Sequence, residues 1–191
     1  MVFKDAGKTT HLLQANFNYN QKGMETLIFT PKIDNRVLEE IETGLTPSGA
    51  LYPRDSHRVS SRIGIFSPAV GFGKEFDFFE YVHSYPKNLQ AIFVDEAQFL
   101  ESNQVRDLGR ICDSLNIPVL CYGLRNSFLG QAFPGSAFLF ATCDKLSEIK
   151  SVCFCGKKAT HNARMDGLGN ILRQGPEVVI GGNELYSSLC R

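Results

Sequence analysis

The sequence predicts an α/β fold with a parallel sheet, followed by a small metal-binding module towards the C-terminus. Apolar strand-like runs alternate with segments of helical periodicity, the order found in parallel sheets with right-handed crossovers. The run Ala91–Val94 is continuously apolar, as expected of a strand covered on both faces. Two closely spaced cysteines, Cys153 and Cys155, follow the last of these runs. We therefore expect a main domain over residues 1–148 and a small module over residues 149–191.

Local patterns place the elements of the main domain. Apolar residues spaced as on one helix face predict helices, and short apolar runs predict strands. The expected order is a helix over 11–22, a strand over 25–33, a helix over 73–85, a strand over 91–94, a helix over 105–115, a strand over 118–124 and a short helix or turn over 135–142. Residues 37–57, rich in glycine, proline and charge, predict an insertion or flexible loop. A flap near the site and a solvated insertion without consequence both fit this segment.

The segment Ala6–Thr10 has the residue types of a phosphate-binding loop at the start of a helix. Such a loop uses backbone N–H groups at the helix N-terminus, a lysine for the β- and γ-phosphates and a hydroxyl for magnesium. Gly7, Lys8 and Thr9 supply these in turn. The full loop pattern also has a leading glycine, where this chain has Val2, and a preceding strand. Either the sequence shown begins late, or the loop lacks its usual anchor.

Asp95 and Glu96 follow the apolar run Ala91–Val94 directly. A buried parallel strand delivers such residues to the edge of the sheet, where Asp95 can hold hydrated magnesium and Glu96 can accept a proton. Each motif alone is weak, because Gly-Lys-Thr occurs by chance and Asp-Glu pairs are usually solvated. Together they predict a site for a nucleoside triphosphate with Mg²⁺.

The composition argues against several classes of protein. The 191 residues can bury one core and a small appended module. With 20 basic and 20 acidic residues, the chain lacks the positive charge expected of a protein that binds a nucleic-acid polymer. It has no apolar stretch of membrane-spanning length and no signal-peptide core. We therefore expect a cytoplasmic protein with neither a membrane nor a nucleic-acid polymer as its partner.

The six cysteines fall into two groups. Three lie in apolar segments and are most simply core residues: Cys112, Cys121 and Cys143. Cys153 and Cys155 form a knuckle, and Cys190 follows a second strand-like run over 178–182, which is the layout of a zinc ribbon. A tetrahedral site takes four ligands, and we expect the fourth to fall beyond Arg191. The alternative is that Cys153 and Cys155 are incidental strand residues.

Seven segments occur in a fixed order along nearly the whole chain except residues 37–57: Ala6–Thr10, Asn18–Asn20 with Gly23 and Met24, Ile33–Arg36, Ser60–Gly64, Val94–Leu100, Cys121–Arg125 and Ile180–Glu184. In this order they resemble the zinc-ribbon type of thymidine kinase, especially its bacterial branch. Seven ordered segments are far more specific than one motif. The resemblance implies a P-loop, RecA-like sheet and a C-terminal module that combines a zinc ribbon with a substrate-covering loop, the lasso.

The resemblance implies transfer of the γ-phosphoryl group of ATP to the 5′-hydroxyl of thymidine, in a family that is commonly homotetrameric. Glu96 matches the catalytic base, Thr9 and Asp95 match the magnesium contacts, and Asp34 and Arg62 fall in segments around the phosphate site. Arg62 also fits a plain salt-bridging role. The residues that match ATP and phosphate contacts are Val2, Phe3, Lys4, Asp5, Ala6, Gly7, Lys8, Thr9, Asp95, Glu96, Ala97 and Gln98.

The resemblance also implies that thymine lies between a loop of the main domain and the lasso. The matching residues are Phe99, Leu124, Phe128, Val179, Ile180, Gly181 and Tyr186. Flat apolar side chains suit a methylated pyrimidine, although Leu124 and Phe128 also fit ordinary core packing. The implied cofactors are Mg²⁺ with ATP and a structural Zn²⁺ at Cys153, Cys155 and Cys190. Acceptance of deoxyuridine stays open.

Two hypotheses of different class follow. The first is an active kinase of pyrimidine nucleotide salvage. The second is a truncated, non-catalytic relative that retains only nucleotide binding or assembly. The presence of Gly7, Lys8, Asp95 and Glu96 favours the first. A polymer-dependent ATPase of the recombinase kind shares both loop motifs, but it explains neither the cysteine knuckle nor the neutral charge.

Overall fold

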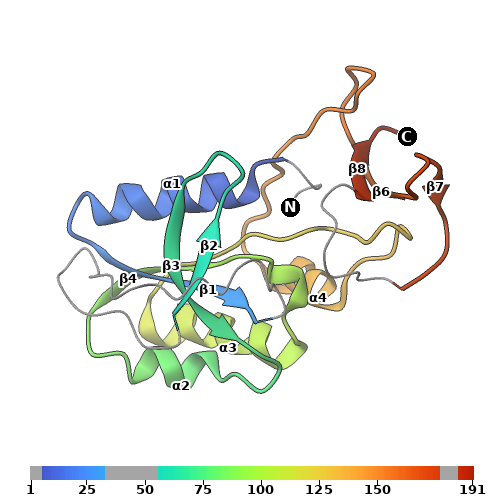
Figure 1. Ribbon diagram of the computed structural model, residues 1–191. Coiled ribbons are helices and arrows are strands. Elements are labelled where there is room, and N and C mark those ends of the chain that lie inside the picture. The colour runs from blue at the N-terminus through green and yellow to red at the C-terminus, as the bar shows by residue number, and fades with distance from the viewer. Residues whose placement is uncertain (1–5, 33–55, 177–184) are drawn as a thin grey trace.

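The computed structural model describes residues 6–32, 56–176 and 185–191. They form an α/β main body and a small three-stranded sheet (Figure 1). The elements are, in order, α1 (Lys8–Asn20), β1 (Glu25–Pro31), β2 (Ser56–Ser60), β3 (Phe66–Phe72), α2 (Phe78–His83), β4 (Leu89–Val94), the 3₁₀ helix η1 (Ala97–Phe99), α3 (Ser102–Leu115), β5 (Val119–Cys121), α4 (Pro134–Thr142), β6 (His161–Met165), β7 (Ile171–Leu172) and β8 (Tyr186–Leu189). Within the described residues, no helix combines the length and apolar character needed to cross a bilayer.

The main sheet has the strand order β2-β3-β1-β4-β5. β1 runs parallel to β3 and β4, and β4 runs parallel to β5, whereas β2, at one edge of the described sheet, runs antiparallel to β3. In the centre, Phe29 pairs with Val70 on one side and with Val94 on the other. The predicted parallel sheet is confirmed, and the carboxyl ends of β1, β4 and β5 meet at one edge.

Helices cover both faces of this sheet, with α1 on one face and α2 and α3 on the other (Figure 1). Alternate residues of each strand therefore enter different cores. Ile28 and Phe93 pack with Leu12 of α1, whereas Phe29 packs with Ile111 of α3. This double burial explains why the central strands are continuously apolar in sequence.

The helix expected over residues 73–85 is limited to α2. The Asp77 carboxylate caps it by accepting from the Glu80 N–H at 2.8 Å. The segment before it forms a loop, which the fully buried Gln104 anchors from α3. The Nε2 of Gln104 is 2.8 Å from the Gly73 carbonyl oxygen and 3.2 Å from that of Phe76. A tertiary anchor therefore determines where this helix starts.

Strand β3 was not predicted from the sequence. Pro68 obscures its pattern, because proline cannot donate a hydrogen bond to a neighbouring strand. Pro68 pairs with Arg58 of β2, while the pairing of β3 with β1 begins only at Val70. β2 begins at Ser56, inside the expected insertion 37–57, and the rest of that insertion lies outside the described residues.

The second sheet has the order β7-β6-β8, with β6 antiparallel to both neighbours. It follows the knuckle at Cys153 and carries Cys190 directly after β8. The strand-like run expected over 178–182 lies outside the described residues, and the domain division at residue 148 stays a prediction.

Candidate active site

The predicted phosphate-binding segment forms the N-terminus of α1. Gly7 is the N-cap residue, with a φ of 79°, a left-handed conformation that glycine adopts without strain. Because Gly7 has no side chain, it does not itself cap α1, whose first residue is Lys8. Backbone N–H groups at an uncapped helix start favour an anion. The helix thus begins directly after the glycine, as expected of a phosphate-binding loop, and its apolar periodicity follows from Leu12 onwards.

The predicted acidic pair lies at the carboxyl end of β4. The Asp95 N–H donates to the Phe29 carbonyl at 2.9 Å, which ties this end of β4 to β1. Glu96 has a φ of 47°, a left-handed conformation that costs energy in a residue other than glycine. Strained residues of this kind are concentrated at functional sites, where the surrounding structure holds them. The turn at Glu96 redirects the chain into η1.

The structure brings these two motifs together across 86 positions of sequence. The Thr9 hydroxyl donates to Asp95 Oδ2 at 3.2 Å, and Lys8 Nζ lies 3.5 Å from Glu96 Oε1. The side chains of Lys8 and Glu96 are only 10% and 14% exposed. The helix start and the acidic strand end therefore form one site.

Asp95 is the most buried charged group of this site, at 5% exposure. Burial, and then the negative charge of Glu96, raises the pKa of Asp95 to about 7 against the opposing effects of Lys8 and Thr9. Its Oδ1 is buried and has no hydrogen-bond partner among the described residues. A buried carboxylate with a spare oxygen, beside a hydroxyl, is a donor set that suits Mg²⁺. The residues present therefore fit this ion.

Gln98 connects Glu96 to the next loop of the sheet edge. Its Nε2 donates to Glu96 Oε2 at 2.5 Å, and its Oε1 accepts from the Leu124 N–H at 2.9 Å. Gln98 is 3% exposed, and the neighbouring Ala97 is fully buried. Both were expected among the ATP contacts. In the structure the Gln98 side chain orients Glu96 and holds Leu124, a connection that sequence spacing did not indicate.

Four residues expected around the base lie in described parts of the chain. Phe99, at the end of η1, makes an edge-on contact with Phe133 at 6.1 Å between ring centroids. Leu124 and Phe128 are half-buried, and Tyr186 is a half-buried residue of β8. Phe133 itself was missed by the sequence analysis. It precedes Pro134 in an apolar stretch, where nothing distinguished it from a core residue.

Within the described ranges, the structure does not place the other predicted residues in this site. Arg62 is exposed in the turn between β2 and β3, and its phosphate role stays a prediction. The remaining ones fall outside the described residues: Val2, Phe3, Lys4, Asp5, Asp34, Val179, Ile180 and Gly181.

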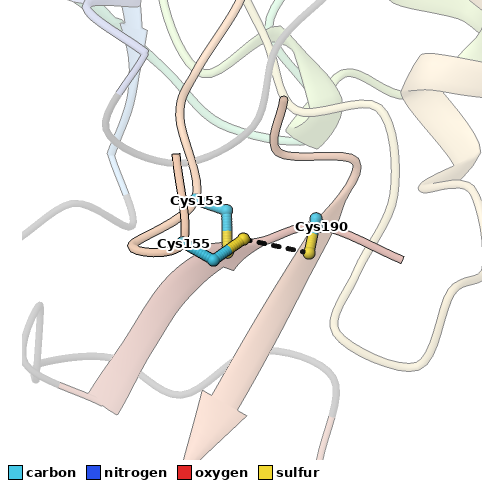
Figure 2. Close-up of side chains that lie close together, drawn as sticks. All are labelled: Cys153, Cys155 and Cys190. Atoms are coloured by element: carbon cyan, nitrogen blue, oxygen red, sulfur yellow. Dashed lines mark hydrogen bonds between the residues drawn. The ribbon is translucent and has the colours of Figure 1, made fainter. Parts of the chain in front are cut away.

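The three C-terminal cysteines converge, as Figure 2 shows. The sulfur atoms of Cys153, Cys155 and Cys190 all lie within 4.8 Å of one another, and those of Cys155 and Cys190 are 3.6 Å apart. Four thiolates at 2.3 Å from a tetrahedral zinc would be roughly 3.8 Å apart. The spacing therefore fits three ligands of a zinc site.

The local backbone supports this arrangement. The Cys153 carbonyl accepts from the Gly156 N–H at 2.9 Å, closing a tight turn, and Gly156 has a φ of 81°. Backbone N–H groups of Cys155 and Cys190 lower the pKa of Cys153 to about 7, which favours the metal-binding thiolate. The other three cysteines lie elsewhere, and the expectation that Cys143 is a core residue is wrong. It is exposed, at the C-cap position of α4.

Comparison with known proteins decides the family. The thymidine kinase family model matches residues 49–191. The chain belongs to the thymidine kinase family. It is 48% identical over 189 residues to the thymidine kinase of Zymomonas mobilis, an alignment that covers 98% of this chain and 89% of that protein. The thymidine kinases of Salmonella choleraesuis and Escherichia coli O157:H7 are 43% and 42% identical, over 98% of this chain and 84% of each protein.

Membership of the thymidine kinase family confirms the resemblance carried by the seven segments, including its bacterial character. It makes the chain a nucleoside kinase, a phosphotransferase of nucleotide salvage, rather than a polymer-dependent ATPase. The combination of a mainly parallel sheet with a cysteine cluster near the C-terminus fits this family.

Proposed function

We propose that the chain transfers the γ-phosphoryl group of ATP to the 5′-hydroxyl of thymidine, giving ADP and thymidine monophosphate. The observation that carries the proposal is the convergence of Lys8 and Thr9 with Asp95 and Glu96 at one edge of the sheet. The names of the relatives supply the substrate, since each is a thymidine kinase.

The roles follow from the charges of the groups. N–H groups at the start of α1 and the Lys8 ammonium would bind the β- and γ-phosphates. Thr9 and Asp95 would hold Mg²⁺, which when bound neutralises negative charge on the phosphates. Lys8 is paired with Glu96 in the described structure. Phosphate binding to Lys8 would draw it from that pair and leave Glu96 able to accept a proton.

Glu96 is the proposed general base. It would take the proton of the 5′-hydroxyl while the hydroxyl oxygen attacks the γ-phosphorus and the bond to ADP breaks. The hydrogen bond from Gln98 leaves one Glu96 oxygen committed and orients the other. The same Gln98 side chain accepts a hydrogen bond from the Leu124 N–H. One amide therefore positions both the proposed general base, Glu96, and the loop at Leu124 that is proposed to contact the nucleoside.

The nucleoside base would lie among apolar side chains. We assign Phe99, Leu124, Phe128 and Tyr186 to this contact, with the lasso residues Val179, Ile180 and Gly181 completing it. Zinc held by Cys153, Cys155 and Cys190 would fix the module from which the lasso projects. Homotetramer formation and a cytoplasmic location belong to the same proposal.

The test is phosphorylation of thymidine by the purified chain with ATP and Mg²⁺, compared with a Glu96→Gln variant. Loss of a general base lowers turnover by about 10²–10⁴-fold, and binding of ATP should persist. Glu75→Gln is the matched control, because Glu75 is exposed on the loop before α2. Full turnover by Glu96→Gln would remove Glu96 as the base. A wild-type chain that binds ATP without phosphorylating thymidine would instead favour the non-catalytic alternative.

A further inference from the structure

Strand β6 of the small sheet contacts the main-body loop 124–128 through side chains at alternate positions. Asn162 Nδ2 donates to the Asn126 carbonyl at 3.0 Å, in a contact that is buried. The Arg164 guanidinium lies over the Phe128 ring, 5.2 Å from its centroid. Residues two positions apart on a strand share a face, so one face of β6 is the docking surface. This surface holds the loop that carries two of the proposed base contacts.

Arg164 also contacts the backbone on its other side. Its Nη1 donates to the Pro176 carbonyl at 2.9 Å. The guanidinium also packs against the neighbouring Gly175, where an added Cβ would be in ordinary van der Waals contact with Nη1 at 3.6 Å. Across the sheet, Arg164 pairs with Tyr186 of β8. Arg164 therefore contacts Phe128 and the backbone that leads towards the predicted lasso, and Tyr186 is its cross-strand neighbour.

We propose that Arg164 is a positioning residue for nucleoside binding: it sets the distance between the Phe128 ring and the backbone at Pro176, on two sides of the base. The inference rests on the proposed function, which assigns Phe128 to the base contact. It concerns Arg164, which neither the motifs nor the family resemblance singled out.

The chemistry of arginine suits this role. A guanidinium is planar and permanently charged, so it can cover an aromatic face while donating in its own plane. Its Nε is buried and has no hydrogen-bond partner among the described residues, which means that protein covers this part of the group, whereas the Nη1 contact with Pro176 is exposed. A lysine would keep the charge and one donor but would lose the planar fit.

The test compares Arg164→Ala and Arg164→Lys with the wild type in steady-state kinetics. Losing one cation–π contact and one charge-assisted hydrogen bond should raise KM for thymidine roughly ten-fold. KM for ATP and kcat should change by less than about two-fold, because the phosphate site makes neither contact. Arg164→Lys should give a KM for thymidine between those of the wild type and Arg164→Ala. An unchanged KM for thymidine, or an equal rise in both KM values, would overturn the proposal.

Arg110→Ala is the matched control. Arg110 also lies over a phenylalanine, with its guanidinium 4.1 Å from the Phe79 centroid, but on α3. Removing it should leave both KM values unchanged. Amide hydrogen exchange at 124–128 and 173–176 gives a measurement independent of activity, and it should accelerate in Arg164→Ala but not in Arg110→Ala. Equal exchange in the two variants would refute the positioning role even if the wild type phosphorylates no thymidine, an outcome that would separately refute the proposed function.

Discussion

Replacing Gly135 with alanine should destabilise the protein and disturb the active site together. Gly135 is buried near the start of α4, packed against η1. An added Cβ would lie 2.5 Å from the Leu100 carbonyl oxygen, 2.8 Å from that of Gln98 and 3.0 Å from that of Ala97. All three are backbone atoms, so no side chain can rotate away. The added methyl group must push η1 and α4 apart.

The size of the effect follows from two opposing terms. Overpacking a tight contact costs about 1–3 kcal/mol, while glycine to alanine inside a helix contributes about 0.5–1 kcal/mol in favour. Because carbonyl contacts shorter than 3 Å are severe, we expect a net loss of about 1–2 kcal/mol in the free energy of unfolding. Since η1 carries Gln98, which orients Glu96, kcat should fall as well.

The assay is urea unfolding of Gly135→Ala beside Gly109→Ala. Gly109 lies inside α3, and a Cβ there would meet nothing within 4 Å. Gly109→Ala should therefore stabilise the protein by about 0.5–1 kcal/mol through helix propensity alone. A Gly135→Ala protein that unfolds at the wild-type urea concentration or above would refute the packing argument.

Three other predictions concern buried polar groups and the metal site. Gln104→Leu should lower the free energy of unfolding by about 1–3 kcal/mol, because the loop carbonyls before α2 lose their donor. Gln14→Leu, on the exposed surface of α1, should not lower it. Equal unfolding temperatures for the two variants would contradict this prediction. Asp95→Asn should raise the free energy of unfolding of the metal-free protein by about 1 kcal/mol, because it removes a buried charge beside Glu96. The same variant should lower the rate of phosphoryl transfer. If Asp95→Asn is less stable than the wild type in the presence of chelator, the explanation by a buried charge is wrong. Elemental analysis should find zinc in the wild type, and a chelator should lower its unfolding temperature. Cys153→Ser should lose the metal, whereas Cys112→Ser should keep it. A wild-type protein without zinc would show that the cysteine knuckle does not bind this metal.

Several features could be predicted because they depend on neighbours in the sequence. The glycine and lysine at the start of α1 lie in immediate succession, and so do the buried strand and acidic pair at the end of β4. The cysteine knuckle is equally local. Each combines a short spacing with a hydrophobic pattern, and both the spacing and the pattern can be recognised without knowledge of the fold. The parallel sheet followed from the alternation of strands and helices.

Other features could not be predicted, because a local pattern was obscured or absent. Pro68 obscured the strand pattern of β3. The length of α2 was overestimated because Gln104, which is distant in sequence, anchors the residues before it as a loop. Phe133 and Arg164 resembled ordinary core and surface residues. Their contacts with Phe99 and Phe128 depend on which loops the fold places opposite each other.

The amino-acid sequence by itself determined the kinds of chemistry available: an anion-binding helix start, a paired acidic strand end and a thiolate knuckle. Tertiary structure alone decided which of these meet. Strand order brings Thr9 to Asp95, Gln98 joins Glu96 to Leu124, and β6 sets Arg164 over Phe128. The physical reason is that residue type and spacing set local conformation, whereas contacts between distant segments arise only when the buried faces of the sheet and helices pack in one arrangement.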